Sequence, residues 1–200
     1  MEFKFSDNVL NLKKVMSDLD KLVLDFIKIL NESKIKYVVI SGYVSILLGR
    51  TRTTEDVDMF IEKIDFKKFK QFFNILDKKG YWILNATDIE EPFDMLNDKL
   101  AIRIALKNQV IPNFEIKFPK KDTDYDSLNS PLKIVVNGKT ILTSRLEMQI
   151  PFKLWLGSDK DIEDAIHIYE LFKDNLDRKL LKDTAIKLKV VKEMEKNGIK

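Results

Sequence analysis

The chain has 200 residues, of which 44% are hydrophobic and 34% are charged, and its formal net charge is +3. It has no cysteine and one histidine, which excludes disulfides, thiolate catalysis, cysteine-bound zinc and multi-histidine metal sites. No apolar run approaches the roughly 20 residues of a membrane span, and the N-terminus lacks a signal-peptide pattern. We therefore expect a cytoplasmic protein with no membrane contact.

The first predicted element is a long amphipathic helix. Apolar residues from Leu12 to Leu30 recur at intervals of three and four, which is typical of a helix with one buried face. We expect this helix to cover a sheet and to be the main feature of a segment spanning residues 1–34.

A short apolar run, Ile35 to Ile40, predicts a buried strand that stops at Ser41 and Gly42, with a helix beginning near Tyr43. Glycine lets the backbone approach a ligand, serine offers a hydroxyl, and the free N–H groups of a helix start point at an anion. The turn is a candidate site for a triphosphate, although an ordinary strand-to-helix turn would use the same residues.

Two aspartates, Asp56 and Asp58, lie in or just before the next apolar strand. Side chains two residues apart share one face of a strand, so the carboxylates would repel each other unless a cation lay beside them. Mg²⁺ is the natural candidate, with Mn²⁺ as a substitute, because it combines carboxylates with substrate phosphates. Arg50 and Arg52 could neutralise phosphate charge. The alternative is a solvated strand end.

The middle of the chain should alternate helices and strands. Asp65 can cap a helix that ends at Gly80. In the strand 113–118, alternation puts Glu115 and Lys117 on one face, so Glu115 either looks toward the aspartates or simply balances Lys117 at the surface. Also expected are strands at 81–84 and 100–106, a helix at 88–97, a polar mobile loop at 120–130, and a hairpin at 132–142 around Asn137-Gly138.

Helices are expected from residue 144 to the end. Lys153 lies among apolar residues, so its ammonium needs solvent or an anionic partner such as a nucleotide phosphate. Asp161 could cap the next helix, and His167 is expected to be a packing or surface residue and not a catalyst. The last segment, 177–200, has eight basic and four acidic residues, which could contact RNA phosphates or simply solvate a helix.

Ser41-Gly42, a spacer and Asp56-Val57-Asp58 together resemble the signature of the DNA polymerase β-like nucleotidyltransferase superfamily. The resemblance implies an α/β (α+β) nucleotidyltransferase fold, with a mixed, twisted central sheet flanked by helices, plus an N-terminal helix and a C-terminal helical segment. It divides the chain into residues 1–34, a core at 35–143 and helices at 144–200, forming one compact unit.

Later residues look like the AbiEii/AbiGii-type toxin branch of that superfamily, and the resemblance covers about residues 36–172. The matching features are an arginine and threonine before the aspartates, a third acidic position, a helical lysine, and a helix start containing Asp161 and Asp164. The resemblance implies catalysis and metal binding by Asp56, Asp58 and Glu115, with Lys153 also catalytic, and nucleotide binding by Ser41, Gly42, Arg50, Arg52, Thr54, Lys153 and Asp161.

The implied activity is transfer of a nucleoside monophosphate from an NTP, such as ATP, to an acceptor with release of pyrophosphate. RNA, especially tRNA, or a protein is the favoured acceptor, and a toxin or antitoxin partner is implied. Small antibiotic-type acceptors are an alternative. Serine replaces the commoner glycine at 41 and glutamate the commoner aspartate at 115, so a catalytically inert member of a toxin–antitoxin pair also stays open.

Overall fold

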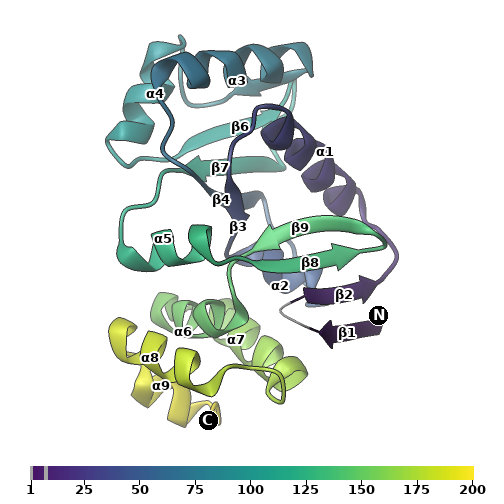
Figure 1. Cartoon of the computed structure of the whole chain (residues 1–200), viewed down its shortest axis with the longest axis vertical. Coiled ribbons are helices and arrows are strands. Elements are labelled where there is room, and N and C mark those ends of the chain that lie inside the picture. The colour runs from purple at the N-terminus through teal and green to yellow at the C-terminus, as the bar shows by residue number, and fades with distance from the viewer. Residues whose placement is uncertain (1, 7–8) are drawn as a thin grey trace.

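A mixed β-sheet runs through the middle of the molecule, with helices against both of its faces (Figure 1). The computed structural model describes residues 2–6 and 9–200. Within those residues the sheet has nine strands in the order β1-β2-β8-β9-β3-β4-β7-β6-β5. Their bounds are β1 Glu2–Ser6, β2 Val9–Lys13, β3 Tyr37–Val39, β4 Asp56–Ile61, β5 Tyr81–Ile83, β6 Ile102–Leu106, β7 Asn113–Lys117, β8 Leu132–Val136 and β9 Lys139–Thr143.

The central strands determine where the polar motifs meet. β3 and β4 are antiparallel, whereas β4 and β7 are parallel, and further parallel pairs join β2 to β8 and β3 to β9. The helices are α1 Asp18–Glu32, α2 Gly42–Leu47, α3 Phe66–Lys78, α4 Glu90–Asn97, α5 Asp122–Asn129, α6 Leu146–Leu156, α7 Asp159–Phe172, α8 Arg178–Leu188 and α9 Val191–Lys196. The predicted α/β class with a mixed sheet is confirmed.

The main core lies between the sheet and helices α1 and α3. The ring of Phe26 on α1 stacks on Phe114 of β7 with 3.9 Å between centroids, and Phe72 of α3 meets Phe26 edge-on at 6.5 Å. On the opposite face of β3 and β4, α5 covers a smaller apolar cluster that includes Val38 and Leu128. That opposite face is only partly covered, and it is the face that carries the two aspartates.

The N-terminal helix was predicted to begin at Leu12, and that starting point was wrong. β2 occupies residues 9–13 and pairs with β8, and α1 begins only at Asp18. Leu10 and Leu12 are buried whereas Asn11 and Lys13 are exposed, which is the period of two typical of a strand. Ser17 then starts the helix through a capping box with Asp20. Segment 1–34 thus contributes strands as well as a helix.

The polar segment 120–130, predicted to be a mobile loop, contains α5 instead. The carboxylate of Asp124 accepts hydrogen bonds from the backbone N–H groups of Lys120 and Lys121, at 2.9 and 3.1 Å, and so caps the helix start. Leu128 is buried against the sheet. Asp124, one of the acidic residues that suggested a loop, is therefore a helix-start signal, and Ser127 and Leu128 are the buried residues of α5.

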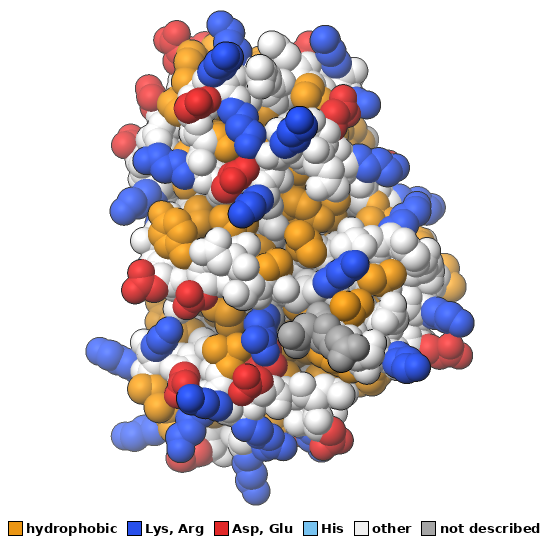
Figure 2. Space-filling view, in the orientation of Figure 1, with side chains coloured by type: hydrophobic (Ala, Val, Ile, Leu, Met, Phe, Trp, Pro, Cys, Tyr) orange, Lys and Arg blue, Asp and Glu red, His pale blue; other side chains and the backbone are white. Residues whose placement is uncertain are grey.

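The end of the chain is helical, as expected. The hairpin of β8 and β9 turns at Asn137 and Gly138, which have φ of +48° and +83°, and it leads into helices α6 to α9 at the bottom of Figure 1. Acidic and basic side chains are interspersed over these helices on the face that Figure 2 shows. Within the described residues no helix has the length and apolar character needed to span a membrane.

Candidate active site

Asp56 and Asp58 share one face of β4, as their spacing predicts. The alternating residues Val57, Met59 and Ile61 are fully buried on the other face, against the core. Burial of those three side chains forces the two aspartates toward the half-open face.

Glu115 lies directly beside Asp58. The parallel pairing of β4 with β7 places Asp58 opposite Glu115 and Asp56 opposite Asn113. Phe114 and Ile116 are buried, which leaves Glu115 on the aspartate face. The structure therefore brings the three predicted acidic residues to neighbouring positions, although their metal-binding role stays a prediction.

Lys117 is the residue that sequence reasoning treated only as a surface partner. Its ammonium lies 3.2 Å from Oδ1 of Asp58 and 3.1 Å from Oε1 of Glu115, so it bridges the two carboxylates. Burial opposes the charge on Lys117, but the carboxylates of Asp58 and Glu115 outweigh that effect and raise its pKa. The signal in the sequence was the i, i+2 spacing of Glu115 and Lys117, which puts both on one face.

The electrostatics of Asp58 favour a bound cation. Burial raises the pKa of this carboxyl, Lys117 partly offsets the rise, and the charges of Glu115 and Asp56 raise it further. Hard oxygen ligands that repel one another are what a divalent cation neutralises, so the residues fit Mg²⁺ chemically. Within residues 2–6 and 9–200, however, no three acidic or histidine side chains stand close enough to hold a metal, and Lys117 supplies the positive charge.

The strand-to-helix turn has unusual backbone geometry. Ser41 has φ of +63° and ψ of −135°, a conformation that glycine adopts far more readily than serine. A Cβ at Gly42 would lie 3.0 Å from Nη2 of Arg52 and 3.4 Å from Oγ1 of Thr54. A side chain at position 42 would therefore press on the guanidinium of Arg52, which packs against the turn and places a positive charge at the predicted phosphate site.

Replacing Ser41 with glycine should stabilise the protein by about 1 kcal/mol, because it relieves the strain of a positive φ. Ser41→Ala is the matched control, since alanine removes the hydroxyl but keeps the strain. Urea unfolding of the wild type and both variants measures the difference. If the glycine variant is no more stable than the alanine variant, the backbone at position 41 is not strained.

Thr54 connects the turn to the first aspartate. Its hydroxyl Oγ1 donates to the backbone carbonyl of Asp56 at 3.0 Å and lies 3.3 Å from the Oδ1 atom of the same residue. The hydroxyl is also close to Gly42. The threonine thus holds the start of β4 next to the turn.

A second charged cluster forms around Asp164 on α7, whose side chain is completely buried. Nη1 of Arg52 lies 2.5 Å and Nζ of Lys153 lies 3.0 Å from its Oδ2 atom, and Nε of Arg50 lies 3.5 Å from Oδ1. Nζ of Lys153 also lies 2.7 Å from Oδ1 of Asp161. This cluster joins the segment between α2 and β4, which carries Arg50 and Arg52, to helices α6 and α7.

The predicted site residues thus gather in two groups. Asp58 and Glu115 meet around Lys117, with Asp56 on the same face of β4. The predicted nucleotide contacts Arg50, Arg52 and Lys153 meet around Asp164, and Asp161 joins that group through Lys153. Arg52 belongs to the second group and packs on the turn that precedes the first. His167 was predicted to be a packing or surface residue; its Nε2 atom lies 3.1 Å from the carbonyl oxygen of Leu48 and so joins α7 to the end of α2.

Comparison with known families decides which class of protein this site belongs to. The model of a family described as "Nucleotidyl transferase of unknown function (DUF2204)" matches residues 19–200. The chain belongs to this nucleotidyl transferase family. No protein of curated function matches the sequence. The prediction of a nucleotidyltransferase is confirmed, and the narrower resemblance to the AbiEii/AbiGii-type branch stays a prediction.

Solved structures share the fold of this nucleotidyl transferase at low sequence identity. An antigenic nucleotidyltransferase-like protein from Paracoccidioides brasiliensis is 18% identical, with a TM-score of 0.55 over 90% of this chain and 91% of that one. ANT(2″)-Ia in complex with adenylyl-2″-tobramycin is 11% identical, with a TM-score of 0.59 over 86% and 98%. Lincomycin-bound LnuA, a lincosamide antibiotic adenylyltransferase, is 14% identical, with a TM-score of 0.50 over 78% and 98%.

Proposed function

We propose that this nucleotidyl transferase moves a nucleoside monophosphate from an NTP to a hydroxyl group of an acceptor, in a reaction that needs a divalent cation. The observation that carries the proposal is the placement of Asp56, Asp58 and Glu115 side by side, next to a glycine turn packed by Arg52. A family match alone would not distinguish an active member from an inert one.

Each group of residues has a distinct part in the proposed reaction. The acceptor oxygen attacks the α-phosphorus, the bond from that phosphorus to the bridging oxygen breaks, and pyrophosphate leaves. Glu115 takes the proton from the acceptor hydroxyl, while the Ser41–Gly42 turn and Arg52 hold the leaving phosphates. In the described residues Asp58 and Glu115 contact Lys117, and with Asp56 they do not close around a metal. With Lys117 displaced and the side chains drawn together, Asp56, Asp58 and Glu115 would hold Mg²⁺, which when bound withdraws charge from the phosphate oxygens.

We propose that Lys153 and Asp161 support the reaction without contacting the nucleotide. The ammonium of Lys153 already has two carboxylate partners, Asp161 and Asp164, and its side chain is 1% exposed. A direct contact with a phosphate would require it to leave both. We therefore propose that Lys153 and Asp161 are positioning residues that hold Asp164, and through it Arg52, against the turn.

Lys117 should compete with a divalent cation for Asp58 and Glu115. Replacing Lys117 with methionine removes the ammonium and keeps the length of the side chain, so affinity for Mn²⁺ should rise by about tenfold, equivalent to about 1.4 kcal/mol of removed competition. Isothermal titration of the nucleotide-free protein measures this directly. Lys107→Met, which removes a lysine from an exposed ion pair with Asp77, is the control. Unchanged or weaker Mn²⁺ binding would show that Lys117 does not compete with the cation.

RNA is the acceptor we favour, because residues 177–200 have eight basic and four acidic side chains and include helices α8 and α9, which pack against α6, the helix that carries Lys153. Small hydroxylated molecules are the second candidate, since two solved structures of the same fold, those of ANT(2″)-Ia and LnuA, contain antibiotic ligands. A protein acceptor and a toxin–antitoxin partner are further outcomes that the same test can reveal.

The test is a labelling experiment with each of the four α-³²P-labelled NTPs, with Mg²⁺ or Mn²⁺, in the presence of total RNA, soluble protein or a set of antibiotics. Label on RNA that requires both the metal and Asp58 would support the proposal in full. Label on protein or on an antibiotic would support transfer and replace the acceptor. If no NTP labels any of these acceptors, nor releases pyrophosphate, the inert alternative is correct.

A further inference from the structure

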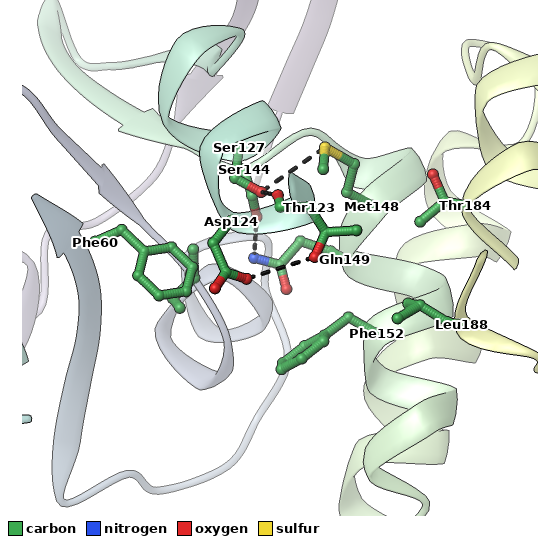
Figure 3. Close-up of a pocket in the computed structure, with 11 residues that line it drawn as sticks. Phe60, Thr123, Asp124, Ser127, Ser144, Met148, Gln149, Phe152, Thr184 and Leu188 are labelled. Carbon is green, nitrogen blue, oxygen red and sulfur yellow. Dashed lines mark hydrogen bonds between the residues drawn. The ribbon is translucent and has the colours of Figure 1, made fainter. Parts of the chain in front are cut away.

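The sheet face that carries the proposed site is closed on one side of the aspartates. Beyond Asp58 on β4, Phe60 packs against the apolar cluster under α5. Figure 3 shows its ring at one side of a pocket that Asp124 of α5 and Phe152 of α6 also line. This pocket has a volume of about 50 Å³, far below the roughly 300–1,000 Å³ of small-molecule sites. This side of the site therefore offers no room for an acceptor.

On the other side of the aspartates, the same face continues onto β7 and β6. The strand register places Asp58 opposite Glu115, and Glu115 opposite Arg103 of β6, so these residues form one row across three strands. The side chain of Arg103 is 57% exposed, and its Nε atom lies 3.5 Å from Oε2 of Glu115. A guanidinium has five N–H donors, so this one long contact uses only a small part of its capacity to bind a ligand.

Trp82 extends this face onto β5, at one edge of the described sheet. It pairs with Ala105, two residues from Arg103 on β6, whereas its neighbour Tyr81 is buried in the main core. Trp82 is 43% exposed, and its Nε1 atom donates to the backbone carbonyl of Gln109 at 3.1 Å. Because the polar atom of the indole already has a partner, its exposed surface is the apolar ring.

The loop between β6 and β7 adds apolar surface at this end of the sheet. Val110 and Ile111 are both exposed. The backbone carbonyl of Val110 accepts a hydrogen bond from Nδ2 of Asn113, at 3.3 Å, and Asn113 is paired with Asp56 across β7 and β4. The apolar surface therefore reaches the residue pair at which the row of carboxylates begins.

An exposed aromatic ring beside a guanidinium is a combination with which proteins bind single-stranded nucleic acid. Diagonal neighbours on paired antiparallel strands lie about 7–8 Å apart, which places Trp82 and Arg103 within the span of one nucleotide. The ring offers a stacking surface to any base, and the guanidinium can donate two parallel hydrogen bonds to a phosphate. This chemistry matches an RNA strand whose end lies over Glu115.

We infer that Trp82 and Arg103 bind the single-stranded end of an RNA acceptor, with a base stacked on Trp82, a phosphate held by Arg103 and the terminal hydroxyl directed to Glu115. The role of Glu115 comes from the proposed function, on which this assignment rests. Binding of the RNA itself needs neither a metal nor an NTP.

Tryptophan fluorescence tests for stacking on Trp82. The chain has two tryptophans, so a Trp155→Phe variant reports only on Trp82, and a Trp82→Phe variant reports only on Trp155. Each protein is titrated, without metal or NTP, against short single-stranded RNAs of one base each and against tripolyphosphate, an anion with no base. We expect saturable quenching of Trp155→Phe by every RNA, no quenching by tripolyphosphate, and no change in Trp82→Phe.

Two substitutions separate stacking from charge in the anisotropy of a labelled RNA. Trp82→Leu and Arg103→Met should each weaken binding by about tenfold, and both side chains are exposed, so the fold should persist. Only Arg103→Met should reduce the slope of log affinity against log salt, by about 0.7, which corresponds to one phosphate contact on a single strand. Trp155→Leu, at the other exposed tryptophan, and Lys28→Met, on α1 at the opposite face of the sheet, are controls that should bind normally.

The outcomes separate this RNA site from the proposed function. The absence of quenching in Trp155→Phe, or losses in the two controls as large as those in Trp82→Leu and Arg103→Met, would overturn the inference. Transfer of label to RNA with an unchanged KM for RNA in both variants would also overturn it, while leaving the proposed function in place. Quenching with the expected losses, but no transfer to any acceptor, would keep the RNA site and overturn the proposed function alone.

Discussion

Replacing Asp58 with asparagine is expected to lower the rate of nucleotidyl transfer by about a thousandfold or more. Asp58 is the acidic residue with neighbours on both sides, Asp56 along β4 and Glu115 across on β7. Asparagine at position 58 removes one of the three carboxylates proposed to share the cation. We expect this loss to cost several kcal/mol of transition-state stabilisation. Label incorporation from the preferred NTP, measured in single-turnover conditions, gives the rate.

The same substitution should not destabilise the metal-free protein. Because burial and the neighbouring carboxylates raise the pKa of Asp58 in the folded state, its charged form is less favourable there than in the unfolded chain. The carboxylate therefore costs stability increasingly as pH rises through that raised pKa, and asparagine removes this cost. We expect an equal or higher Tm at pH 7 for Asp58→Asn, which separates lost catalysis from lost folding.

Asp94→Asn, on the exposed side of α4, is the control for the loss of one negative charge and should leave both the rate and the Tm unchanged. A rate for Asp58→Asn within tenfold of wild type would show that the carboxylates on β4 do not support the reaction. A large fall in Tm would instead show that the ion pair between Lys117 and Asp58 stabilises the fold by more than the repulsion of Asp58 by the neighbouring carboxylates destabilises it.

Replacing Asp164 with asparagine is expected to destabilise the protein by about 3–5 kcal/mol. This carboxylate is completely buried and has three positive neighbours, Arg50, Arg52 and Lys153. Removing this partner of a buried ion pair takes from Arg52 the carboxylate it contacts and leaves Lys153, at 1% exposure with little access to water, with Asp161 alone. Urea unfolding should show a lower midpoint with an unchanged slope.

Glu163→Gln is a matched control one position earlier on α7. Glu163 also pairs with Arg50, but its side chain is 63% exposed, so its loss should cost less than about 1 kcal/mol. Equal losses in the free energy of unfolding for the two substitutions would mean that the burial of Asp164 does not account for its contribution to stability. Asp164→Asn should also weaken NTP binding if Arg52 is held on the turn through this carboxylate.

The face of β4 that carries the aspartates could be predicted because it depends on local pattern alone. Alternation along residues 56–61 determines which side chains meet the core, and the same rule placed Glu115 opposite the buried Phe114. The N-terminal strands could not be predicted in this way. The leucines at 10 and 12 fit either a strand or an extension of the next helix, and only pairing of β2 with β8, more than 120 residues away, decides between them.

By itself, the sequence determined the polar motifs and their local geometry. The glycine turn, the two aspartates on one face and the hairpin at Asn137-Gly138 follow from backbone sterics and periodicity, which act over a few residues. Only the tertiary structure decided what each charge contacts. Lys117 bridges Asp58 and Glu115 because β4 and β7 pair in parallel, and Lys153 is neutralised by Asp161 and Asp164 because α6 packs against α7. Ion pairs of this kind depend on distances of a few ångströms between elements far apart in the chain, and those distances are fixed only when the core is packed.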